Sequence, residues 1–463
     1  MRLYNTLSRT IEDFKPLDDG HVKMYTCGLT VYSQPQIGNW VAYIYSDVLT
    51  RTLIASGYNV DRVQNITDVG HLVSDDDDGE DKMQKGARAE GTTAWQIADK
   101  YSAVAEDEAF NQLGLIRPNK LVRATSLIPE QIAFVQELEV KGFTYIIPDE
   151  GVYFDTSKLD DYGKLARLDI KGLKAGARVE VDGKRNITDF ALWKFSPKEE
   201  QRDMEWDSPW GKGFPGWHLE CSVIARESLG DQLDLHTGGI DHIPVHHTNE
   251  IAQTEAITGK QFVKYWFHNN FMKVNNTKLS KSLGNSYTLA DITAKGFDLD
   301  AFKLLVLSSH YRTEGNFSWE ILESAQNRLN NWRDSIDLIW QEEVAVDNSK
   351  TDDFKKKLLL SLQDDINTPE AIAAIDQVMN AYQQLNFSSS EIRSTAETIS
   401  SLLGIDLLKD KQDLNNDQKQ LLIGRQRARD NKDWQMADKL RDELKQSGIS
   451  VRDTDNGQVW ARR

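Results

Sequence analysis

Cysteine is nearly absent from this sequence: 463 residues contain only Cys27 and Cys221. The two lie far apart, and in a cytosolic protein such cysteines favour a metal-binding or catalytic role over a disulfide. No run of about 18 apolar residues occurs, which excludes a membrane-spanning helix. The N-terminus MRLYNTLSRTIEDF lacks the apolar segment of a signal peptide. We therefore expect a soluble, cytoplasmic protein with no membrane partner.

An excess of basic residues is also missing. The net charge of −17 argues against a nonspecific nucleic-acid binder. Residues 411–463 differ, because they carry 12 Lys and Arg against 9 Asp and Glu. A polyanionic partner can still bind such a local basic surface. The length exceeds that of a single hydrophobic core, so we expect roughly two to four domains.

The N-terminal part carries the pattern of a βαβ unit. Alternating residues in VKMYTCG predict a strand over 22–27. Apolar residues then recur at helical spacing over 37–55, and Gly57 ends the pattern. NVDRVQNIT, residues 59–67, predicts the next strand. This order predicts an α/β fold with a doubly wound, parallel, Rossmann-like sheet.

The rest of the chain changes character twice. Short strands such as GVYFDT and Gly-rich turns over about 120–200 predict an insertion in the sheet domain. QLDLHTGGIDHIPVHHTNEIAQTEAITG predicts another strand, turn and helix that return to the sheet. From about residue 320, few glycines and long amphipathic runs predict helices. The acidic run 74–81 predicts a solvated loop.

Histidines concentrate in one part of the chain. Seven of the nine lie between residues 218 and 310. His246 and Glu250 are spaced i, i+4, which places both on one helix face within reach of a single ion. Cys27 and Cys221 complete a Cys-Cys-His-Glu set that zinc accepts. An isolated His-Glu pair is more often a surface feature, so spacing alone leaves both interpretations open.

Two segments have the character of phosphate-binding turns. QIGN, residues 36–39, opens a helix directly after a strand, where exposed N–H groups and the helix dipole favour phosphate. Gly38 has no side chain and lets a nucleotide approach the backbone. Downstream, NNTKLSKSLGN carries two lysines in a predicted loop that can neutralise phosphate charge in a transition state. The alternatives are a plain helix start and a solvated loop.

Together, these segments carry a family resemblance. KLSKS at 278–282 resembles the KMSKS signature of class I aminoacyl-tRNA synthetases, with Leu279 for methionine, and QIGN occupies the position of their HIGH signature. GWHLEC, NITD and HHTNEIAQTEA are similar to the cysteinyl-tRNA synthetase family in particular. The resemblance extends from MYTCG to the C-terminal GQVWARR.

The zinc ligands of the family match this sequence at four residues, Cys27, Cys221, His246 and Glu250. The sequence departs from the HIGH signature, because Gln36 and Asn39 replace the two histidines of that signature. These amides donate hydrogen bonds to phosphate but cannot carry an imidazolium charge. The replacement therefore bears on the rate of adenylate formation more than on the reaction itself.

The resemblance implies ligation of L-cysteine to tRNA(Cys), with ATP and magnesium, through a cysteinyl-adenylate and with zinc bound to the substrate thiolate. It implies four catalytic residues: Gln36, Asn39, Lys278 and Lys281. The expected ATP contacts are Thr30, Gln36, Gly38, Asn39, Asp241 and Lys281. Trp217 and His218 are expected to bind the amino acid. The expected anticodon contacts are Arg429, Trp434, Asp438 and Asp453, with core packing of a helical bundle as the alternative for Trp434.

We expect a monomer, and the resemblance implies a definite domain order. The first half of the catalytic domain covers 1–120, a connective insertion 121–205, the second half 206–262, a KLSKS and stem-contact region 263–318, a helical bundle 319–405 and a small anticodon-binding domain 406–463. Two other functions are considered. One is a related ligase that joins cysteine to an amino sugar, which the basic C-terminal segment disfavours. The other is a non-catalytic RNA-binding paralogue, suggested by the altered HIGH signature and disfavoured by the intact KLSKS.

Overall fold

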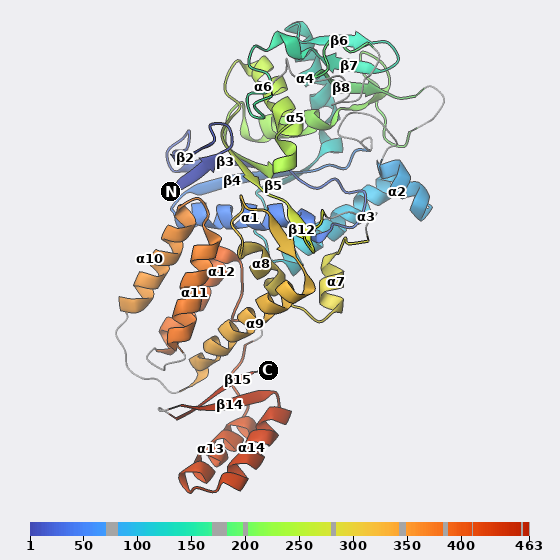
Figure 1. Ribbon diagram of the computed structural model, residues 1–463. Coiled ribbons are helices and arrows are strands. Elements are labelled where there is room, and N and C mark those ends of the chain that lie inside the picture. Colours follow the sequence, from blue (N-terminus) through green and yellow to red (C-terminus); the bar gives the residue numbers. More distant parts are fainter. Residues whose placement is uncertain are drawn as a thin grey trace. The chain divides into compact units, whose positions relative to one another are not determined.

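A computed structural model describes residues 1–70, 82–168, 183–197, 202–278, 284–341, 349–382, 388–409, 411–454 and 457–462 (Figure 1). The chain forms two compact units: residues 1–291 with 311–316, and residues 292–310 with 317–463. The acidic run 74–81 lies outside the described residues, so its predicted solvated loop stays a prediction.

A five-stranded parallel sheet forms the centre of the first unit (Figure 1). Its strands, from one edge to the other, are β11 (Val263–Asn269), β10 (Leu233–Gly239), β3 (His21–Thr26), β4 (Asn59–Ile66) and β5 (Lys120–Arg123). Every neighbouring pair is parallel. The chain order reverses between β3 and β10, and ligands of doubly wound sheets bind outside the carboxyl ends of the strands at such a reversal. The predicted fold class is confirmed.

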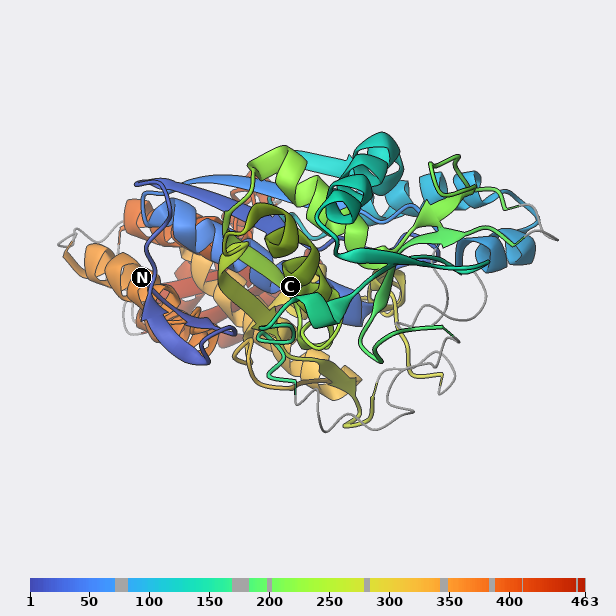
Figure 2. The ribbon, with the colours of Figure 1, turned by 90° about the horizontal axis from the view of Figure 1, so that it is seen from above.

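Helices cover both faces of this sheet. Helix α1 (Ile37–Ala55) connects β3 to β4 and contacts β4, β10 and β11. Helices α5 (Trp217–Leu229) and α6 (His246–Thr258) pack together on the opposite face, where α5 contacts β4 (Figure 1). The view from above shows α5 and α6 in front of the sheet (Figure 2).

Local sequence accounts for both ends of α1. At its start, the backbone N–H of Gln36 donates to Oδ1 of Asn39 at 2.9 Å. Beyond its end, Gly57 has φ of 91°, a left-handed conformation that favours glycine. The predicted apolar stripe is buried along the helix, from Ile37 to Leu53. The predicted helix and its stop are confirmed.

The segment between β5 and α5 forms a smaller layer. Its antiparallel sheet has the order β6 (Thr144–Ile147), β7 (Gly151–Phe154), β8 (Phe190–Phe195) and β9 (Gly213–Pro215). GVYFDT forms β7 as predicted, but helix α4 (Ile128–Val140) was not predicted. Its buried apolar residues, Phe134 among them, pack in one cluster with those of β7 and β8. Strand β5 belongs to the main sheet, although most of it lies in the range 121–205 that was expected to form the insertion.

The remaining elements of this part of the chain are small. They are β1 (Arg2–Asn5), β2 (Thr10–Asp13), α2 (Lys82–Glu90), α3 (Ala94–Glu106), a π-helix (Asp107–Gln112), β12 (Met272–Val274), α7 (Leu289–Ala294) and β13 (Gly315–Phe317). The hairpin β1–β2 contacts β11 through β1, and β12 pairs with β13.

The second unit is mainly helical, as predicted. Its helices are α8 (Leu299–Leu307), α9 (Trp319–Ile336), α10 (Ser349–Gln363), α11 (Thr368–Tyr382), α12 (Ser389–Leu403), α13 (Asn416–Asp430) and α14 (Trp434–Gln446). It ends in an antiparallel hairpin, β14 (Ile449–Thr454) and β15 (Gly457–Arg462), which the sequence analysis did not predict.

Buried Asp337 ties this hairpin to the helices. Its Oδ1 accepts from Nζ of Lys411 at 2.7 Å, and its Oδ2 accepts from the backbone N–H of Arg462 at 3.0 Å. The hairpin is thus a packed part of the unit. Across the described ranges, no helix combines the length and apolarity needed to cross a membrane.

Candidate functional site

Four potential metal ligands meet at the reversal point of the sheet. Cys27 directly follows β3, Cys221 lies in α5, and His246 and Glu250 occupy the first turns of α6. One ligand atom from each lies within 4.8 Å of the others. The Cys27 and Cys221 sulfurs are 3.9 Å apart, and Nε2 of His246 is 3.0 Å from Oε1 of Glu250. All four side chains are buried.

The electrostatics of this cluster suit a divalent cation. Burial opposes ionisation of Glu250, but His236 and His246 outweigh it and lower the pKa of that carboxyl. A hydrogen bond from Cys27 lowers the pKa of the Cys221 thiol to about 7, although burial acts against it. Buried carboxylate and thiolate groups need a compensating positive charge. Two sulfurs, one imidazole nitrogen and one carboxylate oxygen form a donor set that fits zinc.

A second set of donors overlaps the first. Cys27, His236, His247 and Glu250 also bring one ligand atom each within 4.8 Å of one another. Oε2 of Glu250 lies 2.8 Å from Nε2 of His236, and the Cys27 sulfur lies 3.3 Å from Nε2 of His247. Neither His236 nor His247 was predicted to have a specific role. Their crowding into a short span was the only signal in the sequence.

A large cavity distinguishes the two sets. Its volume is about 710 Å³, and Cys27, Cys221 and His246 line it, whereas His236 and His247 are not among the described residues along its wall. A ligand in the cavity therefore reaches Cys27, Cys221 and His246 directly. His236 and His247 lie behind them and contact Glu250 and Cys27, as partners of metal ligands commonly do.

The same cavity gathers the residues expected to bind nucleotide and amino acid. It is lined by Thr30, Gln36, Gly38, Asn39, Trp217, Asp241 and Lys278. These residues come from the β3–α1 connection, the first turn of α1, the start of α5, the turn after β10 and the segment after β12. Lys281 lies outside the described residues.

His218 occupies a different place from the neighbouring Trp217. It is 1 % exposed, it is not among the described residues that line the cavity, and its Nδ1 lies 3.0 Å from Nδ1 of His246. Since Nε2 of His246 faces Glu250, His218 contacts the opposite ring nitrogen and fixes the orientation of that ring. This geometry supports an indirect role through His246.

Close packing under the cavity requires glycine at one position. The backbone N–H of Gly28 donates to Oδ1 of Asn65 at 2.6 Å, and a Cβ at residue 28 would lie 1.6 Å from the carbonyl oxygen of Asn65. No side chain fits there. Gly28, which follows Cys27, thus lets the chain continue beyond the end of β3 in close contact with β4.

The expected anticodon residues form a separate group in the second unit. Nη1 of Arg429 lies 2.9 Å from Oδ2 of Asp453, and the guanidinium lies 5.5 Å from the ring centre of Trp434. Trp434 is 55 % exposed, so its alternative assignment to a helical core is wrong. Asp438 pairs with Arg441 at 3.2 Å.

Comparison with known families covers both parts of the chain. The family described as "tRNA synthetases class I (C) catalytic domain" matches residues 13–327, and "Cysteinyl-tRNA ligase anticodon binding domain" matches residues 411–460. The chain is 45 % identical to cysteine–tRNA ligase 1 of Burkholderia lata, over 99 % of this chain and 96 % of that protein. It is 38 % identical to cysteine–tRNA ligase of Treponema denticola, over 100 % of this chain and 99 % of that protein.

Solved structures share the fold at much lower identity. Mycobacterium tuberculosis methionyl-tRNA synthetase in complex with methionyl-adenylate has a TM-score of 0.59 and 14 % identity, covering 87 % of this chain and 94 % of that one. A putative arginyl-tRNA synthetase from Campylobacter jejuni has a TM-score of 0.56 and 12 % identity, covering 86 % and 95 %. These similarities concern the architecture alone.

Proposed function

The chain belongs to the cysteinyl-tRNA synthetases, a family of class I aminoacyl-tRNA synthetases, and on this premise we propose that it joins L-cysteine to tRNA(Cys) through a cysteinyl-adenylate. The observation that carries this proposal is the buried cluster of Cys27, Cys221, His246 and Glu250, of which the first three line a cavity of about 710 Å³. A soft-metal donor set beside a nucleotide-sized cavity suits an enzyme that selects a thiol substrate.

Selection of cysteine over serine is the task of the proposed zinc site. A plain pocket separates near-isosteric substrates poorly. Cys27, Cys221, His246 and Glu250 would hold the zinc, and the bound metal would supply a site that favours a soft thiolate over a protonated hydroxyl. Trp217 lines the cavity next to Cys221 and is proposed to cover the amino acid. No editing domain is then needed.

Activation of cysteine is proposed to occur between the QIGN turn and the KLSKS segment. The cysteine carboxylate attacks the α-phosphorus of ATP in line, a carboxylate–phosphorus bond forms and pyrophosphate leaves. The amides of Gln36 and Asn39 donate to phosphate oxygens, and Lys278 and Lys281 neutralise the charge that passes to pyrophosphate. Asp241 and Thr30 line the same cavity and are proposed as nucleoside contacts.

Recognition of tRNA is proposed for the C-terminal domain. Arg429, Asp453 and the exposed ring of Trp434 form one group that can hydrogen-bond to base edges and stack on a base. Asp438 lies one helical turn from Trp434 on α14 and belongs to the same proposal. The domain borders at 319–405 and 406–463, and the monomeric state, also remain proposals.

One pair of assays tests this function against both alternatives. The protein is expected to catalyse cysteine-dependent exchange between ATP and pyrophosphate, and then to transfer cysteine to tRNA(Cys). Transfer to glucosaminyl-inositol in place of tRNA would indicate the amino-sugar ligase. Absence of exchange, with tRNA binding retained, would indicate a non-catalytic paralogue.

A substitution at Gln36 tests the altered signature. Gln36→Ala removes a side-chain donor to phosphate and is expected to cost about 1–3 kcal/mol of transition-state binding, measured from kcat/KM for ATP in pyrophosphate exchange. Gln36→His restores a donor and is expected to be tolerated. Exchange by the alanine variant at the wild-type rate would limit the role of QIGN to its backbone.

A substitution at Trp434 tests anticodon recognition. Trp434→Ala is expected to raise the KM for tRNA(Cys) about tenfold, because stacking of a base on an aromatic ring contributes about 1–3 kcal/mol. Trp434→Phe retains a stacking surface and serves as the matched control. Pyrophosphate exchange without tRNA is expected to stay at the wild-type rate in both. An unchanged KM for tRNA in the alanine variant would contradict the assignment.

A further inference from the structure

Glu108 is a buried carboxylate that belongs neither to the Cys-Cys-His-Glu cluster nor to the wall of the large cavity. It lies in the π-helix that follows α3 and is 2 % exposed. The backbone N–H of Leu113 donates to the carbonyl of Glu108 at 2.9 Å, the five-residue spacing of a π-turn. Such insertions in helices recur at functional sites, and a carboxylate is rarely buried this deeply without a partner.

Both carboxylate oxygens accept hydrogen bonds, one from each side of the QIGN turn. Oε1 accepts from Nε2 of Gln34 at 2.8 Å, and Oε2 accepts from Nε1 of Trp40 at 3.0 Å. Gln34 precedes the turn and lines the nucleotide cavity, whereas Trp40 follows the turn and is 1 % exposed. One side chain thus ties both ends of the turn to the π-helix.

This contact requires one side chain that accepts hydrogen bonds from two N–H donors. Gln34 and Trp40 each present an N–H donor, and only a carboxylate accepts from both without rearrangement. Burial raises the pKa of Glu108, while the two hydrogen bonds act in the opposite direction. Hydrogen bonds to a charged acceptor are stronger than neutral ones, so the contact holds the turn firmly.

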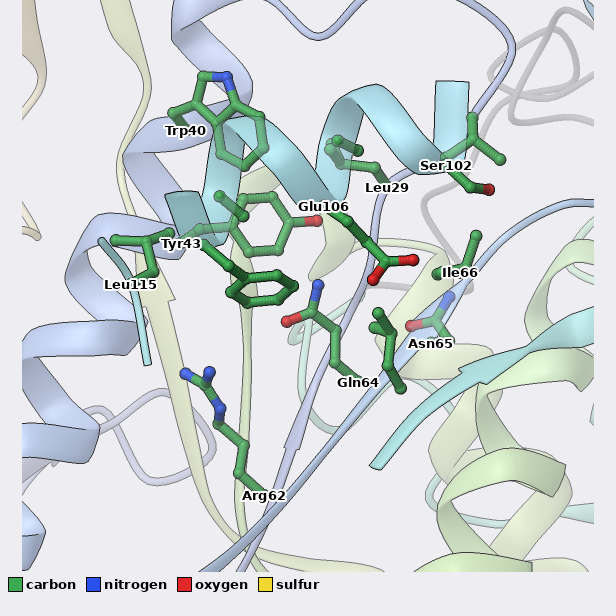
Figure 3. Close-up of a pocket in the computed structure, with 15 residues that line it drawn as sticks. Leu29, Trp40, Tyr43, Arg62, Gln64, Asn65, Ile66, Ser102, Glu106 and Leu115 are labelled. Carbon is green, nitrogen blue, oxygen red and sulfur yellow. The ribbon is translucent and has the colours of Figure 1, made fainter. Parts of the chain in front are cut away.

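A small cavity borders this side of α1. A cavity of about 30 Å³, with room for about one water, is lined by Trp40 and Tyr43 from α1 and by Glu106 and Ala109 from the segment around the π-helix (Figure 3). The ring of Trp40 borders this cavity, so part of the ring has no packing neighbour on that side. The hydrogen bond from Trp40 to Glu108 helps to fix the orientation of the ring.

We propose that Glu108 is a positioning residue for ATP, which holds the QIGN turn so that Gln36 and Asn39 meet the phosphates. The inference rests on the proposed function, since it takes ATP to bind at this turn. Neutral amides replace the two histidines of the HIGH signature here, and neutral hydrogen bonds weaken steeply when distance and angle change. A fixed turn is therefore a requirement for this chain.

Glu108→Ala tests the proposal, because it removes both acceptors. In cysteine-dependent pyrophosphate exchange, the KM for ATP is expected to rise about tenfold, while the KM for cysteine stays within about twofold. Glu108→Gln is expected to rescue the KM for ATP to within about threefold of wild type. Its amide oxygen still accepts from Trp40, and the Gln34 amide can rotate to accept from its NH₂ group.

Asp107→Asn is the matched control. Asp107 is the exposed neighbour in the same π-helix and accepts from Asn111 and Gln112, both at 2.8 Å. This variant perturbs the π-helix without touching the turn, so its KM for ATP is expected to equal that of wild type. The double variant Gln34→Ala/Trp40→Phe is expected to match Glu108→Ala, and adding Glu108→Ala to it should raise the KM no further.

The outcomes separate this inference from the proposed function. A wild-type protein without cysteine-dependent exchange would overturn the function itself. An active wild type with an unchanged KM for ATP in Glu108→Ala would overturn the positioning role. The positioning role would also be overturned if Glu108→Ala had a lowered melting temperature and equal increases in KM for ATP and for cysteine, because that result indicates a general structural role. If Glu108→Ala does not fold, the Gln34→Ala/Trp40→Phe variant decides by the same KM values.

Discussion

Cys221→Ser is expected to lose discrimination between cysteine and serine and to raise the KM for cysteine by about 10² or more, while the KM for ATP stays within about threefold. The substitution keeps nearly the same shape but replaces a soft thiolate with a hydroxyl. A serine hydroxyl stays protonated at neutral pH, so three ligands remain and the coordination shell is incomplete. The part of the cavity proposed to bind ATP is formed by other segments and is expected to be unaffected.

Metal analysis and spectroscopy check this expectation apart from activity. The wild-type protein is expected to contain one zinc per chain, and the variant much less. Adding cysteine to the cobalt-substituted wild type should strengthen the sulfur-to-metal charge-transfer band, and adding serine should not. Absence of metal, or a cobalt spectrum unchanged by cysteine, would contradict recognition through the thiolate.

Ser222→Ala is the control for damage to α5. Ser222 is the residue next to Cys221 and supplies no ligand to the cluster. Its hydroxyl accepts a hydrogen bond from Nε2 of Gln253 at 2.8 Å. Its loss is expected to lower stability by about 1 kcal/mol without changing zinc content or amino-acid selection. An equal loss of zinc in this variant would trace the effect of Cys221→Ser to packing.

Lys281→Ala is expected to lower kcat for adenylate formation by about 10²–10³, with little change in the KM for cysteine. The fourth residue of the KLSKS segment matches the second lysine of the class I signature. Its ammonium group is proposed to stabilise the charge that passes to pyrophosphate, and one such contact typically contributes a few kcal/mol in the transition state. Single-turnover measurement of cysteinyl-adenylate formation isolates this step from product release.

Lys273→Ala separates this effect from a general loss of positive charge. Nζ of Lys273 lies 2.7 Å from Oε2 of Glu314, and both residues line the same cavity. A partly exposed pair of this kind contributes little, so less than about a threefold change in kcat is expected. Near-normal adenylate formation by Lys281→Ala would remove Lys281 from the mechanism.

Short-range patterns predicted the elements that carry the site. The strand before Cys27, the helix from Ile37 to the stop at Gly57, and the face shared by His246 and Glu250 all follow from local periodicity and from glycine at a positive φ. Local patterns did not predict α4 or the β14–β15 hairpin. Their short apolar segments become helix or strand only through the surfaces that they cover.

The amino-acid sequence by itself determined the fold class, the turn that opens α1 and, through its family resemblance, a proposed set of metal ligands. Only the tertiary structure decided which side chains meet. The adjacency of β3 and β10 brings Cys27 near His236 and His247, and the packing of α5 against α6 brings His218 to His246. The tertiary structure also exposes Trp434 and brings Glu108 to both ends of the QIGN turn. The physical reason is range: periodicity records which face of one element is buried, whereas contacts between distant segments depend on strand order and on the packing of every element between them.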